Sequence, residues 1–103
     1  MNILEAIKAV EDGKYIRYED GLENVFFVLE STLIPMNIKS IIQIDLDDID
    51  RMKTYPKDLS GIDYNEVNQV CLSSIRSDEF TEVSYEEMMS EIQEKFKQSR
   101  EDS

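Results

Sequence analysis

The stretch KYIRYEDGLENVFFVLE, residues 14–30, decides the fold that we expect. Its first part alternates, with Tyr15 and Arg17 on one side of an extended chain and Ile16 and Tyr18 on the other. Residues 19–21 have the composition of a turn, and a second β-rich run follows at residues 23–30. The stretch therefore predicts a β-hairpin.

An amphipathic helix is expected before the hairpin, at residues 3–12. Its apolar positions recur at helical spacing, Asn2 is a suitable N-cap, and Gly13 stands where a left-handed residue would end the helix. After the hairpin, residues 31–37 are expected to form a connection. The alternation at residues 42–47 then predicts a half-buried strand, and residues 54–61 have the composition of a loop.

The segment at residues 67–75 fits either a strand or a helix, and we favour the strand. A final helix is predicted from Ser84, because Glu87 three residues later completes a capping-box pattern. An apolar stripe follows, made by Tyr85, Met88, Met89, Ile92 and Phe96. On the exposed side of this helix we expect the ion pairs Glu91–Lys95 and Glu94–Lys97.

These elements predict an α+β fold in which a small, mostly antiparallel sheet of about four strands is packed by an N-terminal and a C-terminal helix, both on one face. The chain of 103 residues fits one domain, residues 1–98, followed by a frayed tail at residues 99–103. No run approaches the roughly 20 apolar residues of a membrane span, and no basic leader precedes an apolar segment. We therefore expect a cytoplasmic protein with no membrane partner.

The composition excludes several common kinds of catalytic and metal-binding site. The chain has no histidine and one cysteine, Cys71, which excludes an internal disulfide, a histidine-dependent catalytic triad and the usual zinc sites. The aspartates 45, 47, 48 and 50 do not match a calcium-binding loop, because Asp50 and Pro56 stand where that loop needs glycine and glutamate. We expect no enzymatic activity, no cofactor and no metal site.

Acidic residues outnumber basic ones by 23 to 11, which gives a net charge of −12. Residues 19–30 hold four acids and no base, and residues 58–90 hold eight acids and one base. One interpretation is an acidic surface that imitates nucleic acid and binds a basic host protein; the other is a solvated surface with no inhibitory role. The candidate partner-binding residues are Glu19, Asp20, Glu23, Asp63, Glu66, Asp78, Glu79, Glu82 and Glu86.

The same charge argues against direct binding of nucleic acid, while self-association is left open. A second candidate site is the group Lys14, Tyr15 and Arg17, where two bases and an aromatic ring would hold a nucleotide by phosphate pairing and stacking. The alternative is that these bases balance neighbouring acids. The sequence thus leaves a small-ligand site as an alternative function.

Residues 3–17, ILEAIKAVEDGKYIR, resemble the start of small phage proteins in which a short helix ends in Gly-Lys and enters a basic strand. Among these is the anti-Thoeris family, which sequesters cyclic ADP-ribose-type signals. The resemblance implies a phage protein that inhibits a host defence, with Lys14 and Arg17 as phosphate contacts. This family commonly follows its first base with a second base and a tryptophan, whereas Tyr18 and acidic residues follow Arg17 here.

Overall fold

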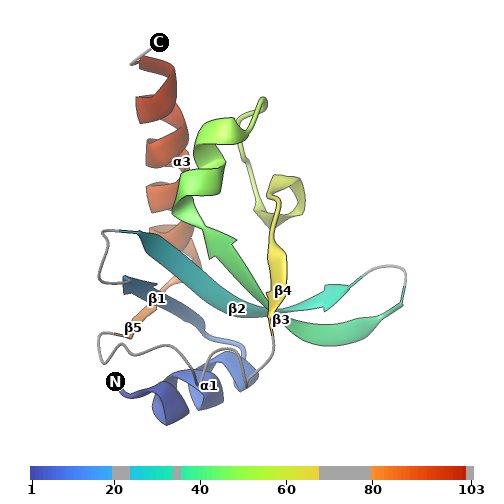
Figure 1. Cartoon of the computed structure of the whole chain (residues 1–103). Helices are drawn as coiled ribbons and strands as arrows, with labels where there is room; N and C mark the ends of the chain where they lie inside the picture. Colours follow the sequence, from blue (N-terminus) through green and yellow to red (C-terminus); the bar gives the residue numbers. More distant parts are fainter. Residues whose placement is uncertain (20–23, 34–35, 68–79, 102–103) are drawn as a thin grey trace.

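The computed structural model describes residues 1–19, 24–33, 36–67 and 80–101. Within these residues the chain forms an α+β fold around one five-stranded antiparallel sheet with the strand order β4-β3-β2-β1-β5 (Figure 1). The elements in chain order are α1 (Ile3–Glu11), β1 (Tyr15–Glu19), β2 (Val25–Leu33), β3 (Ile38–Asp45), the 3-10 helices η1 (Leu46–Arg51) and η2 (Leu59–Gly61), β4 (Asn65–Val67), β5 (Thr81–Val83) and α3 (Tyr85–Glu101).

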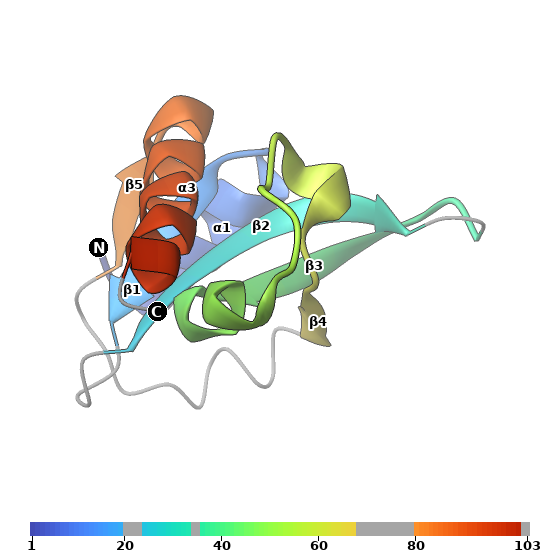
Figure 2. The ribbon, with the colours of Figure 1, turned by 90° about the horizontal axis from the view of Figure 1, so that it is seen from above.

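The two helices lie on opposite faces of the sheet, which corrects the expectation that both cover one face (Figures 1 and 2). The reason lies in β2, the central strand, which is apolar on both sides. Phe27 and Leu29 pack in the core beneath α3, whereas Val28 packs with α1. A continuous apolar run is typical of a strand covered on both faces, so the apolar run at residues 25–29 indicates that both faces of β2 are buried.

Helix α1 forms as its local sequence predicts. The Asn2 side chain accepts a hydrogen bond from the Glu5 N–H at 2.9 Å, and the Glu5 carboxylate accepts one from the Asn2 N–H at 3.3 Å. The helix ends at Glu11, and Gly13, which follows the Asp12 C-cap, has a φ of 87°, the left-handed conformation that glycine adopts without a steric penalty. Ala6 and Val10 are buried against the sheet.

Helix α3 begins at the predicted cap, where the Ser84 hydroxyl accepts a hydrogen bond from the Glu87 N–H at 3.0 Å. Met88 and Ile92, on the apolar stripe of this helix, are fully buried against the sheet. The helix runs to Glu101 and so extends beyond residue 98, where we expected the ordered domain to end.

The sheet has one strand more than the four expected. Strand β5 has three residues, too few for an alternation to be seen in the sequence, and it is held by pairing with β1. Strand β3 begins earlier than predicted, at Ile38, because it pairs with β2 along its whole length. The chain then leaves the sheet at Asp45 and forms η1, which contacts α3 (Figure 2).

Of the segment at residues 67–75, only Val67 is described, and it lies in β4. The choice between strand and helix for the remainder falls outside the described residues. Among the helices of the described part of the chain, none is both long enough and apolar enough to cross a membrane.

Candidate functional site

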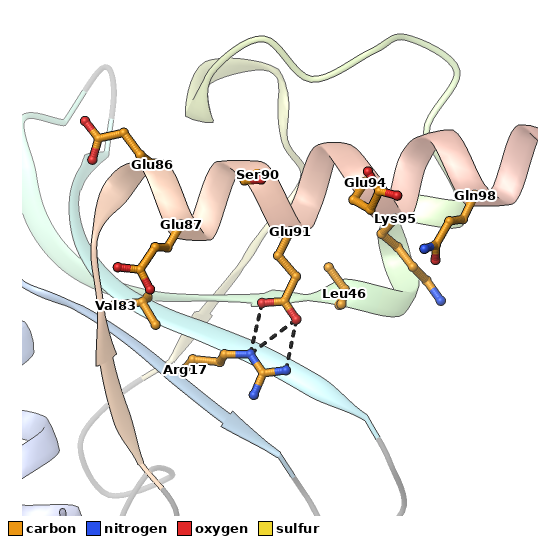
Figure 3. Close-up of a pocket in the computed structure, with 10 residues that line it drawn as sticks. All are labelled: Arg17, Leu46, Val83, Glu86, Glu87, Ser90, Glu91, Glu94, Lys95 and Gln98. Atoms are coloured by element: carbon orange, nitrogen blue, oxygen red, sulfur yellow. Dashed lines mark hydrogen bonds and ion pairs between the residues drawn. The ribbon is translucent and has the colours of Figure 1, made fainter.

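An open groove of about 880 Å³ runs along one side of α3, and we call it the α3 groove (Figure 3). The helix supplies most of its lining, while β1, β5 and the start of η1 each supply one residue. Four carboxylates and two cations line it, so it is acidic. The lining residues are Arg17, Leu46, Val83, Glu86, Glu87, Ser90, Glu91, Glu94, Lys95 and Gln98.

Arg17 and Glu91 form the centre of the groove. The Arg17 Nε donates to Glu91 Oε2 at 2.9 Å, and Nη2 donates to Oε1 at 2.9 Å, which is a bidentate pair between β1 and α3. Another edge of the guanidinium also has a partner, because Nη1 donates to Glu19 Oε1 at 3.1 Å. The hydrogen-bonded Glu91 carboxylate raises the pKa of Arg17 above its ordinary value. This cation is therefore fixed and charged.

Lys95, the other cation of the groove, is shared by two acids of η1. Its Nζ lies 3.9 Å from Asp47 Oδ1 and 3.8 Å from Asp50 Oδ2. Asp45 positions this turn, because its carboxylate accepts a hydrogen bond from the Asp47 N–H at 2.9 Å. The rim of the groove is thus acidic on the η1 side as well.

Three further glutamates of α3, Glu86, Glu87 and Glu94, line the groove; Figure 3 shows the Glu86 carboxylate pointing away from the Arg17–Glu91 pair, at the start of the helix. All three side chains are exposed, and none has an ion pair within the described residues. Exposed carboxylates without partners are available to cationic groups from another molecule. The chemistry that this arrangement offers is the binding of lysine or arginine side chains.

The predicted acidic surface is divided by the fold. Glu86 lines the α3 groove, and Glu19 borders it through Arg17. Glu82 lies on β5 at one edge of the sheet, where it pairs with Lys14 on the side of α1. Asp63 and Glu66 are exposed at the opposite edge, just before and within β4. Three strands separate these edges, so the described acids of residues 58–90 do not lie together. Asp20, Glu23, Asp78 and Glu79 lie outside the described residues.

The predicted ligand group Lys14, Tyr15 and Arg17 is also separated. Lys14 Nζ lies 3.4 Å from Glu82 Oε1 near α1, whereas Arg17 faces α3. The Tyr15 ring packs against Tyr85, with ring centroids 5.8 Å apart. Successive residues of an extended chain point to alternate faces, so Lys14 and Arg17, three positions apart, fall on opposite sides of the sheet.

The aspartates at residues 45–50 make structural contacts in and around η1. Asp45 caps η1, Asp47 and Asp50 pair with Lys95, and Asp48 pairs with Arg51 at 3.7 Å. Within the described ranges, no group of three or more histidine, cysteine, aspartate or glutamate side chains is placed to hold a metal ion. Cys71 lies outside the described residues.

Four residues of the groove, Glu87, Glu91, Glu94 and Lys95, were not among the candidate site residues predicted from the sequence. Their spacing along α3 was visible, but it suggested pairs within the helix. In the structure Glu91 pairs with Arg17 and Lys95 with the η1 aspartates, so tertiary partners replace the expected Glu91–Lys95 pair. A charged residue on a predicted helix does not reveal which distant strand or turn will face it.

Comparison with known proteins adds no family to these observations. No family model, curated protein or solved structure matches the chain. The groove itself is therefore the basis for a functional proposal.

Proposed function

We propose that this chain is a non-enzymatic interaction protein that binds a partner of basic surface through the α3 groove. The observation that carries the proposal is the set of exposed carboxylates on Glu86, Glu87 and Glu94, which have no ion pair among the described residues. They border the apolar side chains of Leu46 and Val83, which give a partner some apolar contact area. Charge complementarity of this kind fixes the orientation of a partner and speeds its association.

A nucleic-acid-binding protein is the class of partner that this surface fits best. Glu87 and Glu94 lie two helical turns apart, about 10.5 Å along the axis, with the Arg17-paired Glu91 between them, so the glutamates form a row of carboxylates on a rigid support. The lysines and arginines that bind phosphates gain the same electrostatic energy from such a row. A partner bound in this way would have its nucleic-acid site occupied, which is inhibition by occlusion.

A role against a host defence, and a phage origin, remain predictions that rest on the resemblance of residues 3–17. The alternative of a small-ligand site needs Lys14 and Arg17 to converge on one phosphate group. The structure places them on different sides of the sheet, each paired with a carboxylate. The geometry therefore favours the protein-binding function over ligand capture.

The test is an affinity capture from bacterial extract with three immobilised proteins: the parent chain, the variant Glu86→Gln/Glu94→Gln and the variant Asp63→Asn/Glu66→Gln. Both variants lose two negative charges, but only the first loses them from the groove. We expect the parent and the second variant to retain the same basic protein, the first variant to lose it, and duplex DNA to displace it.

Salt provides an independent control, because the Debye length falls from about 8 Å at 0.15 M to about 3 Å at 1 M salt. Capture through exposed carboxylates must weaken over this range. The proposal is wrong if both variants lose the captured protein equally, if DNA does not displace that protein, or if the parent chain captures no protein. In the last case the acidic groove is a solvated surface without a partner.

A further inference from the structure

A second charged surface lies at the C-terminal half of α3, where residues 51–57 pack against the helix. The Gln93 Nε2 donates to the Pro56 carbonyl oxygen at 3.0 Å. The Tyr55 ring meets the Phe96 ring edge-on, with centroids 5.7 Å apart and an interplanar angle of 79°. These contacts fix the segment on the helix and place its basic residues beside those of α3.

We call the resulting cluster the basic patch. It consists of Lys97 and Arg100 on α3 and of Lys53 and Lys57, which flank Tyr55 in the segment that packs on them; Arg100 lies over the Phe96 ring and donates to the Met52 carbonyl oxygen. The Lys97 Nζ lies 5.8 Å from the centroid of the Tyr55 ring. All four basic side chains are exposed, and Lys53, Lys57 and Lys97 have no ion pair within the described residues. In a chain with a net charge of −12, this is a concentration of positive charge.

The position of Lys97 and Arg100 near the C-terminus of a helix has a simple structural explanation, since cations there interact favourably with the helix dipole. That explanation does not extend to Lys53 and Lys57, which come from a loop. The loop brings two more cations to an end of the helix that is already basic. Like charges repel, so this arrangement favours an anionic partner.

We propose that the basic patch binds the α3 groove of a second copy of this chain. The proposal rests on the proposed function in one respect, because it uses the same groove carboxylates. The groove extends along α3 from Glu86 to Gln98, whereas the patch lies where residues 51–57 pack on Gln93 and Phe96, so the two surfaces have no residue in common. A contact between two different surfaces is heterologous, or head-to-tail, and it leaves a free groove and a free patch at the two ends of every open assembly.

A second copy fits the patch better than nucleic acid does. Nucleic acid carries charge along its whole length, so its phosphates would also approach acids that neighbour the patch, such as Glu94, three residues before Lys97 on α3. The chain measures 40 × 35 × 21 Å, which is several times the Debye length of about 8 Å, so acids far from the contact repel the second copy only weakly. Only the opposed patch and groove then interact strongly.

The test is sedimentation equilibrium of the chain alone, at about 0.15 M and about 1 M salt and at concentrations up to about 1 mM, where weak contacts associate. Three variants are compared with the parent. Glu86→Gln/Glu94→Gln removes charge from the groove and Lys53→Gln/Lys97→Gln removes it from the patch. Lys8→Gln/Lys39→Gln is the control for the patch variant, because it removes two exposed lysines elsewhere.

At 0.15 M salt we expect the average mass of the parent and of the control to rise with concentration above 12.0 kDa. Each of the other variants should associate at least tenfold more weakly. An equimolar mixture of those two variants keeps one intact patch and one intact groove, so it should reach twice the monomer mass and stop there. High salt should reduce association in every case.

A parent that remains monomeric up to 1 mM would overturn the proposal, as would association that the groove and patch variants leave unchanged. A labelled single-stranded oligonucleotide is titrated in parallel. If the monomeric parent binds it and the patch variant does not, the patch serves nucleic acid instead. A monomeric parent that still captures a basic protein refutes self-association alone, so the two proposals fail separately.

Discussion

The bidentate pair between Arg17 and Glu91 is expected to contribute measurably to the stability of the fold. It joins β1 to α3 across 74 residues of sequence, and its two N–H···O contacts of 2.9 Å have the geometry of strong charge-assisted hydrogen bonds. The side chains are 29% and 34% exposed, which is intermediate between a surface pair and a buried one. Breaking the pair should therefore loosen the attachment of α3 to the sheet.

The magnitude follows from two opposing terms. At an effective dielectric constant of about 20 and a charge separation of about 4 Å, the attraction is about 4 kcal/mol. Partial desolvation and the ordering of two long side chains offset most of it. We expect a coupling energy of about 1 to 2 kcal/mol, above the 0.2 to 1 kcal/mol typical of exposed pairs. In a domain of about this size, 1 kcal/mol corresponds to roughly 4–8 °C in Tm.

A double-mutant cycle with Arg17→Met, Glu91→Gln and the double variant measures this coupling from urea unfolding. Glu91→Gln leaves the Glu19 contact in place, so it should destabilise less than Arg17→Met does. Glu94→Gln is the matched control, and its effect should stay within about 0.5 kcal/mol. A coupling energy below about 0.3 kcal/mol, or one that does not fall in 1 M salt, would refute the reasoning.

Three further predictions concern the fold. Ile92→Ala truncates a fully buried side chain and should lower the free energy of unfolding by about 2 to 5 kcal/mol, measured by urea unfolding. Leu4→Ala, at a position that is 75% exposed, is the control and should change it by less than about 0.5 kcal/mol. Gly13→Ala should cost about 1 kcal/mol in the same assay although no atom lies within 4 Å of an added Cβ, because the φ of 87° is strained for alanine. The hydroxyl of Ser60 and then its N–H donate to Asp58 and lower the pKa of the Asp58 carboxyl below its ordinary value of 3.8. The contribution of this carboxylate to stability is therefore present above pH 3.8 and is lost as the pH falls through the lower folded value. Carboxyl NMR titration should show the lowered pKa, and Asp58→Asn should destabilise the chain at pH 7 and lose its effect at low pH.

The local elements were predictable because their signals lie within a few residues. Asn2 and Ser84 cap the helices as their sequence contexts indicate, and Gly13 ends α1 with a positive φ. The β1–β2 hairpin and the final amphipathic helix follow from alternation and from helical spacing. These features depend on backbone sterics and on hydrogen bonds between near neighbours, which the sequence shows directly.

The arrangement of the elements was less accessible. The side of the sheet that each helix covers depends on how both faces of β2 are buried, and a prediction that assumed one buried face placed both helices together. Strand β5 is only three residues long and owes its place to the pairing with β1. Short edge strands of this kind are selected by a partner strand and not by their own composition.

Net charge, local capping and the absence of histidine chemistry were therefore properties of the sequence alone. The tertiary structure decided where the charge is placed. It separated Glu66 from Glu82 at opposite edges of the sheet, joined Arg17 to Glu91, and gathered basic residues of two nearly neutral segments at one end of α3. The physical reason is that electrostatic interaction depends on distance in space, and strand pairing and helix packing determine that distance between residues far apart in the chain.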